Sequence, residues 1–257
     1  MTPDSTQSDT TSVQRAPDEI DYVRETIKRA RFVLFDFDGP ICRLFAGLSA
    51  AQIADEQIRW LASRGLHGLL TKDVRDETDP FAVLRAVEHR RPNSDLVAEL
   101  EERLTQHELS AVPSAWPTEY ADVVIRTWTA VGARLAITTN NSARTVDRYL
   151  ESRRLTGCFA PHVYGRTHDL HLLKPHPSVL LRALTAMGAD PSETVMVGDA
   201  PSDYLAARAA GVAFLGFARN ERKAGLLREV GAPDECLVAS WDSVLGFLRD
   251  NGTPVRA

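Results

Sequence analysis

The chain has 257 residues, 44% of them apolar, and a formal net charge of −5 at pH 7. This composition can bury a sizeable core and suits one large domain or a core with a smaller inserted domain. The acidic balance and the scattered basic residues argue against a nucleic-acid partner. Three widely spaced cysteines, Cys42, Cys158 and Cys236, indicate thiols in a reducing compartment, which predicts a cytoplasmic protein.

The N-terminal 18 residues are polar and acidic and contain no apolar core segment. We expect residues 1–18 to be a disordered tail, neither a signal peptide nor a membrane anchor, and we expect no membrane partner. Residues 19–30 have the apolar spacing of a helix, and residues 31–37, RFVLFDF, have the apolar run of a fully buried strand. The strand is predicted to stop at Gly39 and Pro40.

Residues 48–107 show helical patterns and no convincing strand. Two of these helices have an expected N-cap, Asp79 for the first and Asn93 for the second. The block therefore predicts a small helical insert over residues 48–111. The remaining parts, residues 19–47 and 112–257, would form the core domain.

Strands and helices alternate from the insert to the C-terminus. A helix is expected from Pro117 to a glycine near its end, followed by the strand RLAIT. The later elements are strands PHVYG, TVMVG and VAFLGF and helices from Ser142, Pro177, Ser202 and Trp241. Such alternation predicts an α/β fold, a Rossmann-like parallel sheet with helices on both faces.

Polar residues follow the expected strands where each strand ends. They are Asp36 and Asp38, the segment TTNN at residues 138–141, Lys174 in a loop, and Asp199 and Asp203. Taken singly, an aspartate after a strand is typical of a helix N-cap or a turn. Because ligands bind beyond the carboxyl ends of parallel strands, the four segments together predict a single site.

The same four segments match, in order, the motifs of a known family. DFDGP, the Thr-Asn of AITTNN, the lysine of LLKPHP and VGDAPSDYLAARAAG resemble the haloacid dehalogenase superfamily, most of whose members are magnesium-dependent phosphatases. The likeness spans residues 32–215 apart from the insert. The insert directly follows the first motif, which resembles the branch of phosphoglycolate phosphatases and β-phosphoglucomutases with its helical cap. This resemblance implies a small inserted all-α cap domain on a Rossmann-like core.

Phosphoryl transfer needs a nucleophile, a proton donor for the leaving oxygen, and positive charge. Asp36 is the expected nucleophile, which would form an aspartyl-phosphate. If the chain stays extended, Asp36 and Asp38 share a side, so Asp38 would protonate the leaving alcohol and later activate water. Gly39 would let the backbone turn sharply and approach the phosphate.

The remaining motifs supply hydrogen bonds and positive charge. Lys174 would bind a phosphate oxygen and keep the nucleophile ionised. Thr139 and Asn140 are also expected at the phosphate. Thr139 is preferred to Thr138 because neighbouring strand residues face opposite ways and the resemblance places the functional threonine directly before the asparagine. The bond between Lys174 and Pro175 is left open as cis or trans.

The expected cofactor is Mg²⁺, a hard cation that prefers oxygen ligands. Asp199, together with Asp36 and the backbone carbonyl of Asp38, would hold it. Asp203 is expected one shell further out, where it would orient waters or the lysine.

Two residues of the first motif, Pro40 and Asp38, bear on the expected activity. Pro40 stands where the family usually has threonine or valine, which predicts a changed loop rigidity and not a loss of activity. Asp38 itself is diagnostic, because dehalogenases and phosphonate-cleaving relatives lack an acid there. Phosphate esters are therefore the expected substrates.

Residues outside these motifs are given plainer interpretations. His67, Lys72 and Arg75 could face the site and select the substrate, but an ordinary solvated loop is favoured. His176 belongs to a set of loop histidines, without the partners of a zinc site, and could lie near the active site.

The sequence thus predicts a Mg²⁺-dependent phosphomonoesterase acting on a small phosphorylated metabolite. Two alternatives stay open, a phosphomutase with the same site and a catalytically silent relative that binds a phosphorylated ligand. The sequence also leaves open whether the protein is a monomer or a homodimer.

Overall fold

The computed structural model of the protein describes residues 17–76 and 78–251. Residues 1–16 of the expected tail lie outside this range, and helix α1 (Pro17–Arg29) begins at its first residue. None of the helices within the described residues combines the length and the apolar character that a membrane span requires.

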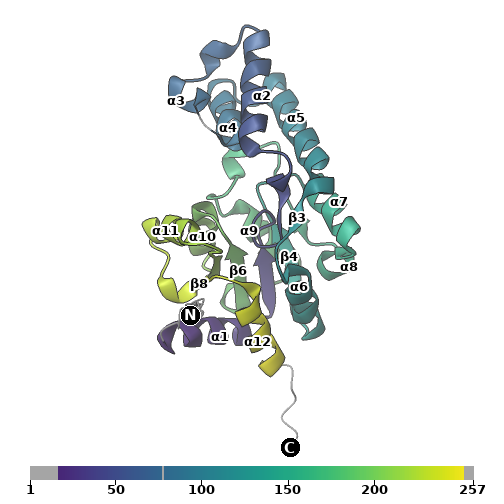
Figure 1. The fold of residues 1–257 in the computed structure, drawn as a ribbon, viewed down its shortest axis with the longest axis vertical. Coiled ribbons are helices and arrows are strands. Elements are labelled where there is room, and N and C mark those ends of the chain that lie inside the picture. The colour runs from purple at the N-terminus through teal and green to yellow at the C-terminus, as the bar shows by residue number, and fades with distance from the viewer. Residues whose placement is uncertain (1–16, 77, 252–257) are drawn as a thin grey trace, which may run out of the picture.

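A six-stranded parallel sheet forms the centre of the core (Figure 1). In spatial order it consists of β5 (Val163–Tyr164), β4 (Arg134–Thr138), β1 (Phe32–Phe35), β6 (Thr194–Gly198), β7 (Ala213–Phe217) and β8 (Leu237–Val238). The central strand β1 pairs with β4 and β6 on either side, with Phe35 opposite Ile137 and Val197. The carboxyl ends of these three strands therefore lie side by side, as the sequence predicted.

Helices cover both faces of the sheet. Alternate residues of β1, which point to opposite faces, are buried in two different apolar clusters. Val33 and Phe35 pack in one cluster and Leu34 in the other. The first cluster takes residues from α1, α6 (Ala121–Ala130), α7 (Ala143–Arg153), α8 (Thr156–Phe159) and α12 (Trp241–Asn251). The second takes residues from α9 (Ser178–Met187), α10 (Pro201–Ala209) and α11 (Glu221–Glu229). The predicted Rossmann-like α/β core is confirmed.

An aromatic group anchors the loop that follows β1. The Phe35 ring contacts those of Trp128 and Trp241 at centroid distances of 5.5 and 6.0 Å. The buried indole N–H of Trp241 donates to the carbonyl of Pro40 at 2.9 Å. Pro40, which differs from the usual residue of the first motif, has no backbone N–H to donate. Its carbonyl is still available and accepts this hydrogen bond from the core.

The insert consists of helices and lies beyond the carboxyl ends of the strands (Figure 1). Its helices are α2 (Ala50–Ser63), α3 (Lys72–Arg75), α4 (Pro80–Arg90) and α5 (Asp95–Ala111). They share a separate apolar cluster that includes Ile53, Leu84 and Leu100. The all-α insert is confirmed, and its division from the core at residues 48 and 111 stays a prediction.

One expected N-cap is confirmed and another is wrong. The Asp79 carboxylate accepts from the N–H of Phe81 at 2.9 Å and caps α4. Helix α5 is capped by Ser94, whose hydroxyl accepts from Val97, and not by Asn93. Asn93 instead has φ of 52° and donates its N–H to Glu88, which suits the tolerance of asparagine for left-handed backbone.

The helix expected from Pro117 begins later, at Ala121. Pro117 lies in β3 (Trp116–Pro117), which pairs antiparallel with β2 (Cys42–Arg43) where the chain leaves and re-enters the core. This long-range pairing overrides the local helix-start signal. The short strand β8 and helix α11 were also absent from the sequence prediction.

Candidate active site

A cavity of about 1390 Å³ lies between the carboxyl ends of the strands and the insert. The core residues that line it include Asp36, Asp38, Thr139, Lys174 and Asp199. The structure therefore brings together the carboxylates, hydroxyl and ammonium that the sequence placed at one site.

Lys174 occupies the centre of a buried cluster of charges. Its Nζ lies 2.8 Å from Oδ1 of Asp36, 2.6 Å from Oδ1 of Asp203 and 2.9 Å from the carbonyl of Thr138. Burial alone would lower the pKa of Lys174, but the charges of Asp203 and Asp36 outweigh it and raise the pKa. The lysine is therefore a cation held between two carboxylates.

Asp203 organises the turn that carries Asp199. Its Oδ2 accepts from the backbone N–H of Asp199 at 3.1 Å and of Ala200 at 3.0 Å. Burial raises the pKa of Asp203 to about 7 and that of Asp199 to about 6, despite the ammonium groups beside them. Acidic groups in this state favour an additional cation, since it would stabilise their ionised forms.

Three carboxylates are close enough to hold that cation. Asp36, Asp199 and Asp203 each offer an oxygen within 4.8 Å of the other two. An all-oxygen set of this kind fits a hard divalent ion such as Mg²⁺. Which oxygens would coordinate it stays a prediction.

Sequence analysis missed a further cation beside these carboxylates. Nζ of Lys223, on α11, lies 2.7 Å from Oδ2 of Asp199. No local signal marks this lysine in the sequence, because α11 lies outside the matched motifs and reaches Asp199 only through folding.

Asp38 has different hydrogen-bond partners from Asp36. Its Oδ1 accepts from the N–H of Leu44 at 2.8 Å, and removal from water raises the pKa of Asp38 to about 6. Phe37, between the two aspartates, is fully buried, whereas Asp36 and Asp38 both line the cavity. A carboxyl group whose pKa is raised toward neutral pH suits a general acid.

Gly39 permits the backbone after β1 to approach the carboxylate of Asp199. Its φ is +125°, and a Cβ at this position would lie 2.3 Å from Cγ of Asp199. No other residue type fits both the backbone conformation and the space.

The segment of residues 139–142, which we call the phosphate loop, follows β4. The Thr139 hydroxyl donates to Oδ1 of Asn141 at 3.1 Å, whereas Thr138 points to the sulfur of Met196. The Asn140 side chain holds the backbone of Lys174 from both sides, accepting from its N–H at 2.8 Å and donating to its carbonyl at 3.1 Å. Binding of phosphate by Thr139, Asn140 and Gly39 stays a prediction. The peptide bond between Lys174 and Pro175 is cis.

The insert contributes a second wall to the cavity. This wall consists of Asp79, Phe81, Arg85, Glu88 and His89. His67, Lys72 and Arg75 lie elsewhere on the insert and are exposed, as the favoured interpretation expected, although Lys72 and Arg75 belong to α3 and not to a loop. His176 lines the cavity, from the loop that also carries Lys174.

Comparison with known families decides the relationship. The family model described as haloacid dehalogenase-like hydrolase matches residues 78–217, more than half of the chain. The chain belongs to the haloacid dehalogenase-like hydrolases. The first motif, with Asp36 and Asp38, lies before the matched span.

Individual members agree with this assignment. A phosphoglycolate phosphatase of Salmonella choleraesuis is 27% identical over 212 residues, which cover 75% of this chain and 82% of the relative. Two solved structures share the fold of this hydrolase. A putative β-phosphoglucomutase of Bacteroides vulgatus has a TM-score of 0.64 at 18% identity and covers 91% of this chain and 98% of its own. A family hydrolase of Deinococcus radiodurans with bound phosphate and sodium has a TM-score of 0.56 at 24% identity, with coverage of 90% and 100%.

Proposed function

We propose that the protein is a Mg²⁺-dependent phosphomonoesterase that hydrolyses a small phosphorylated metabolite through an aspartyl-phosphate on Asp36. The observation that carries the proposal is the ammonium of Lys174, buried 2.8 Å from Asp36 at the floor of a large cavity. The names of the relatives, phosphoglycolate phosphatases, support the same reaction class.

In the first step a carboxylate oxygen of Asp36 attacks phosphorus, and the bond from phosphorus to the ester oxygen breaks. Asp38 gives its proton to the leaving oxygen, which departs as an alcohol. Its raised pKa, about 6, makes the protonated form accessible near neutral pH. Lys174 and the hydroxyl of Thr139, which turns its proton from Oδ1 of Asn141 to the substrate, bind the non-bridging phosphate oxygens.

In the second step Asp38, now ionised, takes a proton from a water molecule as that water attacks phosphorus. The bond between phosphorus and the Asp36 oxygen breaks, which releases inorganic phosphate and restores the carboxylate of Asp36 and the protonated Asp38. Mg²⁺, held by Asp36, Asp199 and the backbone carbonyl of Asp38, would neutralise charge on the phosphoryl oxygens. Asp203 keeps Lys174 in place and orders the turn that bears Asp199.

The location of the insert supports a role in enclosing the substrate. Arg85 and His89 of α4 form part of the cavity wall that faces the catalytic carboxylates. Closure of this wall over a small substrate would exclude bulk water from the reaction. We place the protein in the cytoplasm on the basis of its free cysteines, two of which are buried.

The proposal is tested by phosphate release from phosphoglycolate, sugar phosphates and nucleotides, with Mg²⁺ and with a chelator. We expect turnover of at least one class of ester with Mg²⁺ and its loss with the chelator. Asp36→Asn should lower the rate at least about 10³-fold because the nucleophile is removed. The matched control is Asp55→Asn, which alters an exposed aspartate on α2 and should leave the rate unchanged. Normal turnover by Asp36→Asn would refute the assignment of the nucleophile.

A further inference from the structure

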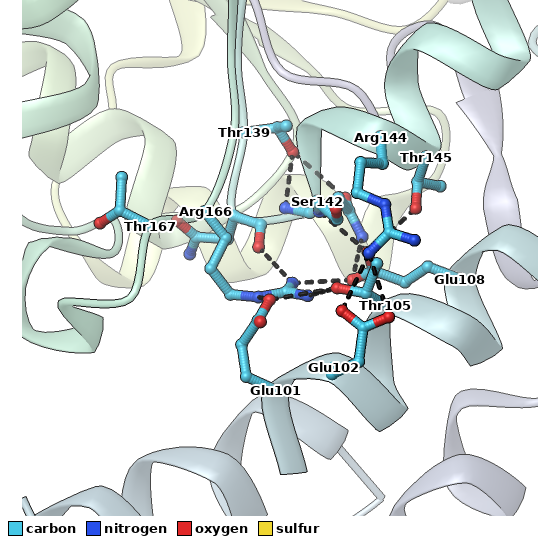
Figure 2. A network of polar contacts seen from close by, with 12 residues as sticks. Glu101, Glu102, Thr105, Glu108, Thr139, Ser142, Arg144, Thr145, Arg166 and Thr167 are labelled. Atoms are coloured by element: carbon cyan, nitrogen blue, oxygen red, sulfur yellow. Dashed lines mark hydrogen bonds and ion pairs between the residues drawn. The ribbon is translucent and has the colours of Figure 1, made fainter. Parts of the chain in front are cut away.

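A second buried cluster of charges lies beside the phosphate loop, centred on Arg166 (Figure 2). Its guanidinium donates to Glu101, Thr105 and Glu108 of α5, each at 2.9 Å. The side chains of Arg166 and Glu108 are fully buried. The three partners on α5 are spaced four and three residues apart, so they lie on one face of the helix. We call Arg166, Glu101, Thr105 and Glu108 the Arg166 cluster.

The cluster contacts the backbone of the phosphate loop from two sides. Arg166 donates from Nη1 to the carbonyl of Asn140 at 2.9 Å and from its own N–H to the carbonyl of Asn141 at 2.8 Å. Glu108 accepts from the N–H of Ser142 at 2.8 Å and from the side chain of Asn141 at 3.2 Å. One ion pair thus satisfies backbone donors and acceptors of consecutive loop residues.

The segment that carries Arg166 packs directly on this loop. The carbonyl of Tyr164 accepts from the N–H of Thr139 at 3.0 Å. A Cβ at Gly165 would lie 2.5 Å from the backbone nitrogen of Ala143 and 2.7 Å from the carbonyl oxygen of Asn141. Glycine at this position is therefore what allows the guanidinium to reach the loop.

Two hydrogen-bond paths lead from the cluster to the groups proposed to bind phosphate. In the first, Glu108 accepts from the side chain of Asn141, whose backbone N–H donates to the hydroxyl oxygen of Thr139 at 3.2 Å. In the second, Arg166 holds the carbonyl of Asn140, whose side chain grips the backbone of Lys174. The hydroxyl of Thr139 and the backbone of Lys174 are each one residue removed from the buried ion pair.

We propose that Arg166 and Glu108 are positioning residues for phosphoryl transfer, which set the phosphate loop so that Thr139 and Lys174 meet the same phosphate. The inference rests on the proposed function. Arginine suits the task because its planar fork fixes several acceptors in one geometry. The same contacts join α5, and with it the insert, to the loop. A structural anchor alone would stabilise the fold without affecting the affinity for phosphate, and this difference can be measured.

The chain offers a matched control on the same helix α5. Arg144 of α7 donates to Glu102 of α5 at 2.9 Å, but this pair is exposed and lies outside the phosphate loop (Figure 2). We would compare Arg166→Met with Arg144→Met, with p-nitrophenyl phosphate as substrate and inorganic phosphate as competitive inhibitor. Arg166→Met should lower kcat/KM about 10- to 100-fold and weaken phosphate inhibition about tenfold, as loss of outer-shell partners does. Arg144→Met should stay within about twofold of the wild type, because an exposed pair contributes little.

Two gentler variants separate positioning from stability and keep the test valid if Arg166→Met does not fold. Arg166→Lys keeps the buried positive charge but loses the planar guanidinium. Relative to Arg166→Met, it should restore more of the thermal stability than of the affinity for phosphate. Glu108→Gln keeps an acceptor but loses the charge, and its effect on kcat/KM should be much less than additive with that of Arg166→Lys.

The outcomes distinguish this inference from the proposed function. Wild-type protein that releases no phosphate would refute the proposed function. An active wild type together with a folded Arg166 variant of unchanged kcat/KM and phosphate inhibition would refute the inference alone. An equal loss in Arg144→Met would also refute it, since docking of α5 on α7 would then explain the effect.

Discussion

Two buried clusters of charge are built from the same parts, and we propose different roles for them: the Lys174 cluster, made of Lys174, Asp36 and Asp203, and the Arg166 cluster. Each buries one cation between two carboxylates, Asp36 and Asp203 for Lys174, Glu101 and Glu108 for Arg166. The ammonium contacts Oδ1 of Asp36, and Asp36 also lines the cavity, where we propose that it binds the metal and attacks the substrate. The guanidinium donates its hydrogen bonds to side chains and to the loop backbone. An ammonium is a compact charge that takes up little of the site, whereas the planar guanidinium fixes the geometry of several acceptors.

The largest expected effect comes from Lys174→Met, which leaves Asp36 and Asp203 buried without their shared cation. Loss of one partner from a buried ion pair costs about 3–5 kcal/mol of the free energy of unfolding. Activity should fall at least about 10³-fold, because the proposed phosphate contact disappears together with the cation beside the nucleophile. Urea unfolding and phosphate release measure the two quantities. Arg166→Met should lose comparable stability and far less activity, so equal losses of activity would break the comparison.

Gly39→Ala tests how strongly the site beside the Lys174 cluster depends on close approach of the backbone to Asp199. The new methyl group would overlap the carboxylate of Asp199, and φ is positive. Gly132→Ala is the control, because Gly132 has φ of +92° and open space around its Cβ position. Strain alone costs about 1–3 kcal/mol in either variant. Gly39→Ala should in addition lower kcat and the apparent affinity for Mg²⁺, and a variant that loses only stability would contradict the account.

The sequence was sufficient to predict the position of a site residue where that residue follows a strand of the sheet. Asp36, Asp38 and Asp199 come directly after β1 and β6, and parallel strands bring their carboxyl ends to one edge. The alternation of apolar runs and helical patterns predicted the parallel sheet, and the run of helical patterns without a strand predicted the helical insert. These signals are local and need no knowledge of how the helices pack.

Contacts made by packing between distant segments were not predicted. Glu108 and Arg166 are 58 residues apart and meet only because α5 docks on the core. In the sequence Glu108 is one charge among several on an amphipathic helix, and Arg166 is a loop residue. Lys223 reaches Asp199 from a helix that was not assigned. Pairing of β2 with β3 likewise displaced the expected start of α6 from Pro117.

A smaller effect is expected for Asp203→Asn, which sharpens the role of the carboxylate behind Lys174. Asparagine keeps one oxygen for a hydrogen bond but loses the charge that faces the ammonium. We expect a fall of about 10- to 100-fold in kcat/KM, less than for Lys174→Met, with a higher Mg²⁺ requirement. Titration of activity with Mg²⁺ measures both. A variant as inactive as Asp36→Asn would place Asp203 among the groups that touch the metal or the phosphate.

The most direct test of the central claim is a search for the phosphoryl group on Asp36. Asp38→Asn should retain the first step with p-nitrophenyl phosphate, whose leaving group needs no proton, and lack the base for the second. With Mg²⁺ we predict a burst close to one equivalent of p-nitrophenolate. After acid quenching, mass spectrometry should find one phosphoryl group on the peptide that contains Asp36, removable by hydroxylamine. A burst with the label on another residue, or steady turnover with no labelled peptide, would contradict the aspartyl-phosphate mechanism.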